Sequence, residues 1–566
     1  MDLEEPIQMD CHNDMTFGKM MGGFIEKHKW LMIGYFLLMF MNPIRDVMAP
    51  HIVGKLYTGI NKNKPIGLYL GILLAIIIVV QVMAVGSDFI ETKLHPMIHK
   101  HVREMMMTHI FKTRENHYSD VEVGDVITKI VKLPSILFNF VDTMKWLLIP
   151  SGLTLIGSII YMFFIDWKIA LPLFAIIGIF GYMLYNSMYT CSVPAVKRDE
   201  TFSTLFSNVD DVLRNMITVL SFDKIDHEFE RLDGWQKEYA KYTEETLNCS
   251  LMAKYVVIPL MLAFVVAMSY YCYLQIKAKK MESGTFVSLL IISFVITNIM
   301  LSVLNSWKDF IMRWGIIEHS LKTFDSCDVV NQAYDGVARE STGIYFQNVD
   351  FTYVSADQQR AVFRDFNLHI RPQEVTLIMG EIGSGKSTIL TVILKYQVPQ
   401  SGVIFMNGVA YSTLNNTAVR RRIGYIPQTP VLMNRSIYEN IVYGLEPEPS
   451  KETVETLMRD LGLEQFLNKL PQGLNTSVGV HGSKLSGGQR QITWVLKAIL
   501  MNPEIIIMDE PTSAVDEETK GVLHYLLENV MEGKTVIMIT HDKYLLKFAD
   551  RVVTMKSGVI VSDERA

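Results

Sequence analysis

Long apolar stretches without a charged residue alternate with polar segments through the first part of the chain. Six of these stretches run from Trp30 to Ile44, Pro65 to Ser87, Trp146 to Ile165, Ile169 to Val196, Tyr255 to Ile276 and Ser283 to Trp307. Most reach the roughly 20 residues that a membrane-spanning helix needs. The first reaches that length only if it continues through Arg45 and Asp46 towards Tyr57. The pattern therefore predicts six membrane-spanning helices.

The polar segments between these stretches alternate in length. Short outer turns are expected at Gly59 to Lys64, Asp166 to Lys168 and Lys277 to Glu282, and long helix-rich inner segments at Glu91 to Lys145 and Lys197 to Lys254. The long segments carry many basic residues, as cytoplasmic loops do. The lysines of the third short turn do not fit this rule. An even number of spans leaves both termini on one side of the membrane.

The N-terminal residues 1–29 precede the first span. The opening MDLEEPIQMD is acidic, whereas a transit peptide is rich in arginine and poor in acidic residues. Residues Phe17 to Lys29 mix apolar and basic side chains, which fits an interfacial helix lying along the membrane surface. A frayed tail is the alternative.

The pattern changes after Phe324. A polar connector covers residues 325–342, and from Gly343 onward short strands such as GIYFQNVDFTY and VIFMN alternate with helices. We therefore expect four parts: a tail at 1–29, an all-α transmembrane domain at 30–324 with long cytoplasmic helical extensions, a linker at 325–342 and an α/β domain at 343–566.

Composition agrees with a membrane protein of several domains. The chain has 566 residues, of which 49% are hydrophobic, and this length is too great for one domain. The net charge of −6 gives no sign of a nucleic-acid-binding surface. Five cysteines are scattered without paired spacing, so the sequence predicts neither a disulfide framework nor a zinc site.

Candidate chemistry is concentrated in one glycine-rich turn. The turn reads GEIGSGKST, between the apolar stretch EVTLIMG and a helical pattern, STILTVILK. This is the strand–loop–helix context of a phosphate-binding loop. Its glycines allow successive N–H groups to face a phosphate. Lys386 can reach the β- and γ-phosphates, and the Ser387 hydroxyl can hold Mg²⁺. The predicted ATP-binding residues are Gly380, Glu381, Ile382, Gly383, Ser384, Gly385, Lys386, Ser387 and Thr388.

Further motifs follow this loop. LSGGQRQ begins at Leu485, and the apolar strand in IIIMDEPTSAVD ends at Asp509, followed by Glu510. A carboxylate next to a metal-binding aspartate can orient or deprotonate the attacking water. His541 follows the strand TVIMIT and could contact the γ-phosphate. Gln428 in GYIPQTP would lie near metal and water, and Tyr353 could stack on adenine.

Together these motifs resemble the ATP-binding cassette (ABC) family, and six spans followed by one cassette resemble an exporter half-transporter. The resemblance implies a P-loop NTPase cassette, ATP and Mg²⁺ as cofactors, and a dimer. Each ATP would lie between one phosphate loop and the partner's signature loop. The implied roles are adenine stacking for Tyr353, the Q-loop for Gln428, the signature loop for Ser486, Gly487, Gly488 and Gln489, metal binding for Ser387, Gln428 and Asp509, catalysis for Glu510, and the switch histidine for His541.

The chain departs from the family pattern near the signature loop. SVGVHG, with Val480 and His481, stands where a stretch such as EVGERG is usual, and ITWVLKA stands in place of a run such as RIAIARA. These changes bear on coupling between cassette and membrane domain, not on hydrolysis. The segments Glu115 to Ile130 and Asp210 to Asp223 resemble the family's coupling loops. The alternative for each is a solvated helical hairpin.

Two groups of residues leave alternatives open. His95 and His99 have the four-residue spacing of metal ligands, and His101 and His109 lie nearby, but no acidic or cysteine partner completes a site. Arg45 and Asp46 point about 100° apart on a helix, so at least one is expected to need its own partner. A structural ion pair and contact with an anionic substrate both remain possible for Arg45.

The sequence thus predicts an ATP-driven exporter half-transporter, working as a homodimer or with a related chain, in a lipid bilayer with its cassette on the cytosolic side. A regulatory or channel-gating module is the alternative, which the complete hydrolytic set disfavours. The six spans exclude a soluble DNA-acting cassette, and an importer usually divides these parts between chains. The transported substrate is left open.

Overall fold

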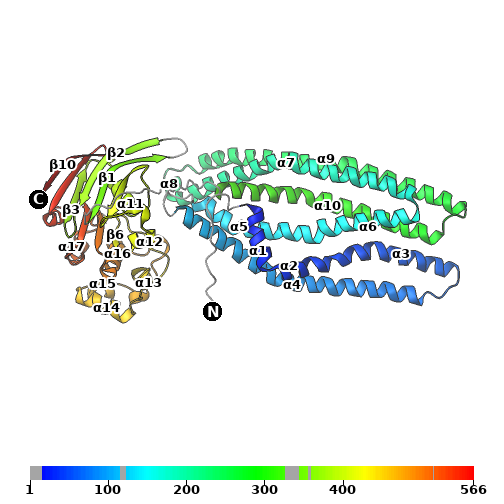
Figure 1. Ribbon diagram of the computed structural model, residues 1–566, viewed down its shortest axis with the longest axis horizontal. Helices are drawn as coiled ribbons and strands as arrows, with labels where there is room; N and C mark the ends of the chain where they lie inside the picture. Colours follow the sequence, from blue (N-terminus) through cyan, green and yellow to red (C-terminus); the bar gives the residue numbers. More distant parts are fainter. Residues whose placement is uncertain (1–15, 115–122, 325–342, 355–358, 514, 566) are drawn as a thin grey trace. The chain divides into compact units, whose positions relative to one another are not determined.

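The computed structural model describes residues 16–114, 123–324, 343–354, 359–513 and 515–565, which belong to two compact units. The first is helical, and the second combines two sheets with helices (Figure 1). In the described residues, six helical segments are long and apolar enough to cross a membrane: Lys29–Asn61, Gly67–Lys112, Lys129–Ile165, Trp167–Arg214, Ile225–Lys277 and Ser283–Leu321. The predicted number of spans is confirmed.

Most of these helices continue far beyond their apolar stretches. The helical unit consists of α1 (Phe17–Lys27), α2 (Lys29–Leu37), η1 (Leu38–Phe40), α3 (Met41–Asn61), α4 (Gly67–Arg114), α5 (Val123–Thr143), η2 (Met144–Leu148), α6 (Ile149–Ile165), α7 (Trp167–Arg214), α8 (Met216–Ser221), α9 (Ile225–Lys277) and α10 (Ser283–Phe324). The tail therefore contains a helix, α1, which buries Met20, Met21 and Phe24. The second inner segment contains the short helix α8, but residues 115–122 of the first lie outside the described part.

Small and polar residues fix where the long helices turn and cross. Asp166 ends α6 and caps α7, because its side chain accepts a hydrogen bond from the backbone N–H of Lys168. Helices α3 and α10 approach closely at Gly54 and Gly284. A Cβ on Gly54 would lie 2.3 Å from the carbonyl oxygen of Gly284, so this crossing requires glycine.

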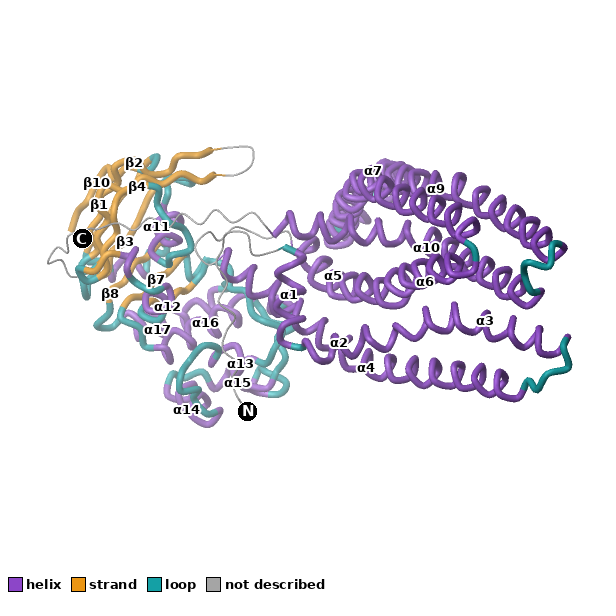
Figure 2. Tube along the Cα trace, turned by 45° about the vertical axis from the view of Figure 1, so that its right-hand side comes forward, coloured by secondary structure: helices purple, strands orange, loops and turns teal. Residues whose placement is uncertain are grey.

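The sequence predicted no disulfide framework, and the structure shows that this prediction is wrong. Cys191 in α7 and Cys249 in α9 form a disulfide bond although 58 residues separate them. The two long helices run side by side in both views of the chain (Figures 1 and 2). Their pairing brings together two cysteines whose spacing along the chain gives no signal. Cys272 is buried and free.

The expectation that at least one of Arg45 and Asp46 needs a partner of its own is also wrong. Arg45 Nε donates to Asp46 Oδ1 at 2.8 Å, so the two neighbours pair with each other within α3. The reason is the length of the arginine side chain, which reaches back around the helix despite the angle between the two Cβ directions. The Arg45 side chain is 42% exposed and that of Asp46 is 16% exposed.

A second ion pair lies inside the helical unit. The side chain of Lys145 is wholly buried, and its Nζ lies 2.9 Å from Glu91 Oε2 on α4. Its ammonium also lies over the rings of Tyr35 and Trp146, at 3.9 and 4.3 Å from the ring centroids. Lys145 belongs to the π-helical segment η2, which interrupts the regular helix between α5 and α6. The sequence reading placed this lysine merely at the end of an inner loop.

The second unit contains two sheets. The antiparallel sheet has the order β2-β1-β4-β5, and the larger sheet has the order β10-β9-β3-β8-β7-β6. The strands are β1 (Ile344–Val354), β2 (Gln359–Ile370), β3 (Val375–Gly380), β4 (Ser401–Met406), β5 (Val409–Ala410), β6 (Ile423–Ile426), β7 (Ile505–Asp509), β8 (Thr535–Ile539), β9 (Arg551–Lys556) and β10 (Val559–Arg565). The helices are α11 (Lys386–Ile393), α12 (Asn416–Arg420), α13 (Ile437–Val442), α14 (Lys451–Asp460), α15 (Glu464–Asn468), α16 (Gly487–Met501) and α17 (Glu517–Met531).

The central strands of the larger sheet are apolar on both faces because packed layers cover both. Alternate residues of β7 enter different hydrophobic clusters: Ile506 and Met508 belong to one, Ile505 and Ile507 to the other. The β8 residues Val536 to Ile539 alternate in the same way. Such burial on both faces is typical of a parallel sheet in an α/β domain. It holds the carboxyl ends of these strands at one edge.

Candidate nucleotide-binding site

The predicted site residues follow neighbouring parallel strands of the larger sheet. Strands β3, β8, β7 and β6 lie next to one another and run parallel. Their carboxyl ends lead into the loop beginning at Gly380, His541, Asp509 with Glu510, and Gln428. In open α/β sheets, ligands bind at this end of the strands. The topology therefore brings together four motifs that are far apart in the sequence.

The phosphate loop has a backbone conformation that requires glycine. Gly383 and Gly385 have φ angles of +81° and +102°, in the left-handed region. Gly385 immediately precedes α11 and provides no side-chain cap, so the first N–H groups of the helix need partners from elsewhere. Gly558 N donates to Ser384 O at 3.0 Å and holds the loop against the β9–β10 turn.

Two side chains define the charge of this loop. Lys386 Nζ donates to the carbonyl oxygens of Gly380 and Glu381, at 2.6 and 2.9 Å, so the ammonium lies over the loop itself. A Cβ on Gly383 would lie 3.3 Å from Arg360 Nη2, which places the Arg360 guanidinium beside the loop as well. Sequence reasoning missed Arg360, because an arginine at the start of a strand matches no motif.

The acidic part of the site lies at the end of β7. Gln428 Nε2 donates to Glu510 Oε2 at 2.8 Å. Glu510 has a φ of +42°, a conformation in which a residue other than glycine is strained and which often occurs at functional sites. Its N–H donates to Ile539 O at 2.7 Å. Burial and the neighbouring Glu510 carboxylate raise the pKa of Asp509, and Lys386 partly opposes this shift.

These groups fit a nucleotide with a divalent cation. Ser384 Oγ is buried without a hydrogen-bond partner among the described residues, and the uncapped start of α11 presents backbone donors beside it. Donors of this kind suit phosphate oxygens. The Asp509 carboxylate and the Ser387 hydroxyl provide the hard oxygen ligands that Mg²⁺ prefers. Burial and the Glu510 carboxylate both raise the pKa of Asp509, and a bound cation would favour its charged form.

The loop that carries His541 is fixed by the next residue. Asp542 accepts hydrogen bonds from Thr512 Oγ1 at 2.7 Å and from His524 Nε2 at 2.8 Å. Burial raises the pKa of Asp542, but the hydrogen bonds from His524, Thr512 and the Tyr544 N–H outweigh it and lower this pKa to about 2. The Asp542 carboxylate thus fixes the loop from both sides. Sequence reasoning missed Asp542, although its position after His541 was a possible signal.

The remaining predicted residues of this part of the site lie on the phosphate loop or in and beside α11. The Tyr353 hydroxyl is 3.4 Å from Thr388 Oγ1, and the residue is 38% exposed, which places it next to α11 with part of its ring accessible. Glu381 and Ile382 are exposed on the loop, and Ser387 is exposed in the first turn of α11.

The signature residues form the start of α16. Ser486 Oγ accepts from Gln489 N at 3.2 Å, and Gln489 Oε1 accepts from Ser486 N at 2.9 Å, which is a capping box. A Cβ on Gly488 would lie 2.4 Å from Thr519 Cγ2, so glycine permits close packing on α17. Within the described ranges, no hydrogen bond joins any of the signature residues 486–489 to the phosphate loop of the same chain.

The structure separates the four histidines of α4. His95 and His99 stack with their ring centroids 4.2 Å apart. His101 instead donates from Nε2 to Met20 O at 3.2 Å and so faces α1, and His109 is buried. No group of three potential metal ligands was found in the described part of the chain.

Comparison with known proteins agrees with this architecture. Residues 31–300 match the model of the ABC transporter transmembrane region, and residues 363–513 match that of the ABC transporter. A putative export ATP-binding/permease protein of Rickettsia typhi is 26% identical over 510 residues, covering 88% of this chain and 86% of the relative. An ATP-dependent lipid A-core flippase of Acinetobacter baylyi is 26% identical over 472 residues, covering 81% of this chain and 79% of the relative.

A solved structure has the same fold. The structure of a bacterial Atm1-family ABC exporter with ATP bound superimposes with a TM-score of 0.82 at 18% identity, covering 95% of both chains. The two matched regions together span most of the chain, in the order membrane region and then cassette. The chain therefore belongs to the ABC transporter family, as an ATP-binding half-transporter of the exporter type.

Proposed function

We propose that two such chains, either identical or this chain with a related half-transporter, form two composite ATP sites. Each site would combine the phosphate loop of one chain with Ser486 to Gln489 of the other. The start of α16 supports this, because its glycines and backbone N–H groups suit an anion and no hydrogen bond in the described residues links them to their own phosphate loop. We place the domain boundary at 325–342, which lies outside the described residues.

Hydrolysis would depend on the polar groups at the end of β7. Mg²⁺, held by Ser387, Gln428 and Asp509, would neutralise phosphate charge. Glu510 would accept a proton from the attacking water, and Gln428 holds its carboxylate through the 2.8 Å hydrogen bond. His541 would donate to the γ-phosphate from a loop that Asp542 fixes. The single observation that carries this proposal is the Gln428–Glu510 contact at the same sheet edge as the phosphate loop.

ATP turnover would drive a substrate outward across the membrane, with the cassette on the cytosolic side. Six spans with large exposed apolar side chains, such as Leu68 and Phe164, support the membrane position. The intact set Glu510, His541 and Ser486 to Gln489 disfavours a module that only gates a channel. Docking of α8 and of residues 115–130 on a cassette stays a prediction.

The test is reconstitution of the full chain into lipid vesicles, with ATP hydrolysis and substrate movement measured on the same preparation. A panel of labelled lipids, peptides and small amphiphiles would be compared. We expect basal Mg²⁺-dependent ATPase activity, stimulation by one substrate class, and ATP-dependent movement of that class. ATP hydrolysis without movement of any class, together with ATP-dependent ion conductance, would favour channel gating instead.

A further inference from the structure

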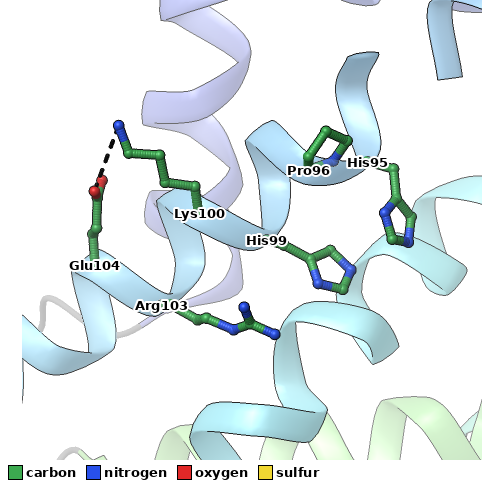
Figure 3. A pocket seen from close by; sticks show the side chains of 6 residues that line it. All are labelled: His95, Pro96, His99, Lys100, Arg103 and Glu104. Carbon is green, nitrogen blue, oxygen red and sulfur yellow. Dashed lines mark ion pairs between the residues drawn. The ribbon is translucent and has the colours of Figure 1, made fainter. Parts of the chain in front are cut away.

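A pocket with a volume of about 450 Å³ lies along α4, beyond its uncharged stretch. Six residues of this helix line it: His95, Pro96, His99, Lys100, Arg103 and Glu104. His95, His99 and Arg103 point to one side of the helix, whereas Lys100 and Glu104 form an ion pair on the adjacent side (Figure 3). The Lys100 Nζ to Glu104 Oε1 distance is 3.6 Å. The function derived above uses none of these residues.

The histidine side of this pocket contains packed rings and one buried ring nitrogen without a partner among the described residues. The rings of His95 and His99 stack, and Phe138 of α5 packs edge-on against His95 with centroids 4.4 Å apart. His99 Nε2 is shielded from solvent and has no hydrogen-bond partner in the described part of the chain. The Arg103 side chain is exposed, and it forms no hydrogen bond or ion pair with any described residue. A buried polar atom without a partner is rare, and a ligand with acceptor atoms would satisfy His99 Nε2 once the ring turns towards the pocket.

Charge decides which ligand suits the pocket. Two histidines four residues apart can bind a metal ion, but the permanent positive charge of Arg103 lies one turn further on the same face. Lys100 adds a second positive charge, and Glu104, the only acidic residue of the lining, is paired with it. A cation would be repelled, whereas an anion would be attracted. A guanidinium and an imidazole N–H are both suitable donors for phosphate oxygens.

The pocket lies level with the start of the first candidate span, Lys29–Asn61. Tyr35 donates from its hydroxyl to Glu91 Oε2 at 3.3 Å, which sets α2 and α4 at the same height there. Lys29, six residues before Tyr35, is about 9 Å further along the helix axis, towards the start of the first span. An equal step along the antiparallel α4 from Glu91 leads to the pocket. Trp30 is 77% exposed at this level, as an aromatic residue of a membrane interface is.

We propose that this pocket binds a phosphate monoester anion at the membrane boundary, with Arg103 and His99 Nε2 as donors. An anionic lipid headgroup and a free phosphate compound share this chemistry. The position of the pocket favours the lipid headgroup, since the lipid chains could remain in the bilayer while the phosphate enters the pocket. Bidentate contact by the guanidinium would distinguish a phosphate monoester from the hindered phosphate of phosphatidylcholine.

The test uses the full-length chain in lipid nanodiscs made of phosphatidylcholine with a small fraction of phosphatidic acid. Native mass spectrometry would count phosphatidic acid molecules retained per chain in the parent, Arg103→Gln and His99→Gln. The matched control is Lys93→Gln, which removes one positive charge from an exposed position of the same helix outside the pocket lining. A parallel arm adds inorganic phosphate as a competitor.

We expect preferential retention of phosphatidic acid by the parent and a roughly tenfold weaker retention in both pocket variants, since each loses one charge-assisted or buried hydrogen bond. Lys93→Gln should match the parent. If the parent shows no preference for phosphatidic acid but binds inorganic phosphate in a way that depends on Arg103 and His99, the anion site stands and its ligand is a soluble phosphate compound. Equal losses in Arg103→Gln and Lys93→Gln, or Zn²⁺ binding that depends on His95 and His99 without any phosphate retention, would overturn the proposal.

Discussion

Gln428 Nε2 and Glu510 Oε2 lie 2.8 Å apart, although 82 residues separate them in the sequence. The contact joins the second residue after β6 to the first residue after β7, across neighbouring parallel strands. It also explains how the carboxylate of Glu510, a residue with a backbone φ of +42°, is held in one orientation. The amide donates to the carboxylate and leaves the second carboxylate oxygen available for a water molecule.

Replacing Glu510 by glutamine should keep the shape of the site but remove the general base. We expect ATP binding to persist and ATP turnover to fall by about 10²- to 10⁴-fold. The measurement is ATPase activity in lipid together with nucleotide binding. Glu504→Gln is the matched control, because Glu504 is an exposed carboxylate just before the same strand. Near-parent turnover in Glu510→Gln would show that another group acts as the base.

The composite sites can be tested with complementary defects. A Lys386→Ala chain loses ATP binding at its own phosphate loop. A Gly487→Asp chain places an anion where the γ-phosphate bound by the partner's phosphate loop should lie. Dimers made of two identical variant chains should lack an intact site, whereas mixed dimers should keep one. We therefore expect more ATP binding and turnover in purified mixed dimers than in either variant alone. If mixed dimers are as inactive as the dimers of each variant alone, the ATP sites are not shared between the two chains.

The buried pair of Lys145 and Glu91 should matter for stability. Lys145→Met leaves the Glu91 carboxylate without its partner, and we expect a loss of the order of 3 kcal/mol, because breaking a buried ion pair typically costs 3–5 kcal/mol and Glu91 remains 30% exposed. Adding Glu91→Gln should recover much of this loss. Thermal unfolding in detergent would measure both effects.

A matched control for that experiment is the exposed pair of Lys62 and Glu282. Its Nζ to Oε1 distance is 2.8 Å, but the two side chains are 52% and 54% exposed. Because water solvates both charges, Lys62→Met should hardly change the unfolding temperature. Equal effects of Lys145→Met and Lys62→Met would mean that the burial of Lys145 has no energetic consequence.

Arg45 and Asp46 allow a test of whether the arginine contacts a substrate. If their mutual ion pair is its main role, Arg45→Gln and Asp46→Asn should each have small effects, and the double variant should resemble either one, with a coupling energy below about 1 kcal/mol. Substrate-stimulated ATPase should then persist in all three. Loss of stimulation by an acidic substrate in Arg45→Gln and in the double variant, but not in Asp46→Asn, would instead assign the arginine to substrate binding.

Asp542 should act as a permanent anion in the neutral range. Its folded pKa of about 2 lies below that of an unfolded aspartate, so its contribution to stability is complete above roughly pH 4 and is lost as the pH falls towards 2. Asp542→Asn should therefore reduce turnover at every pH from 6 to 8 by a constant factor, because the loop of His541 loses its charged anchor.

The control for this prediction is Asp460→Asn, an exposed aspartate at the end of α14. The measurement is the pH profile of ATPase activity in lipid. A ratio of parent to Asp542→Asn activity that varies between pH 6 and 8 would contradict a carboxylate that stays ionised throughout that range.

The sequence by itself determined the features that depend on local patterns. Apolar stretches of sufficient length predicted six spans, and alternating strands and helices predicted the cassette, because burial in lipid or between packed layers constrains each residue according to its neighbours in sequence. The phosphate loop was equally readable, since the conformations of Gly383 and Gly385 and the position of Lys386 are properties of one short segment.

Only the tertiary structure decided which distant residues meet. Cys191 and Cys249 bond because α7 and α9 run side by side, and Lys145 reaches Glu91 because a π-helical segment turns it into the interior. The anchoring of Asp542 by Thr512 and His524 also required the fold. In each case the partners lie on different elements, and packing of those elements, rather than any local spacing, sets the contact.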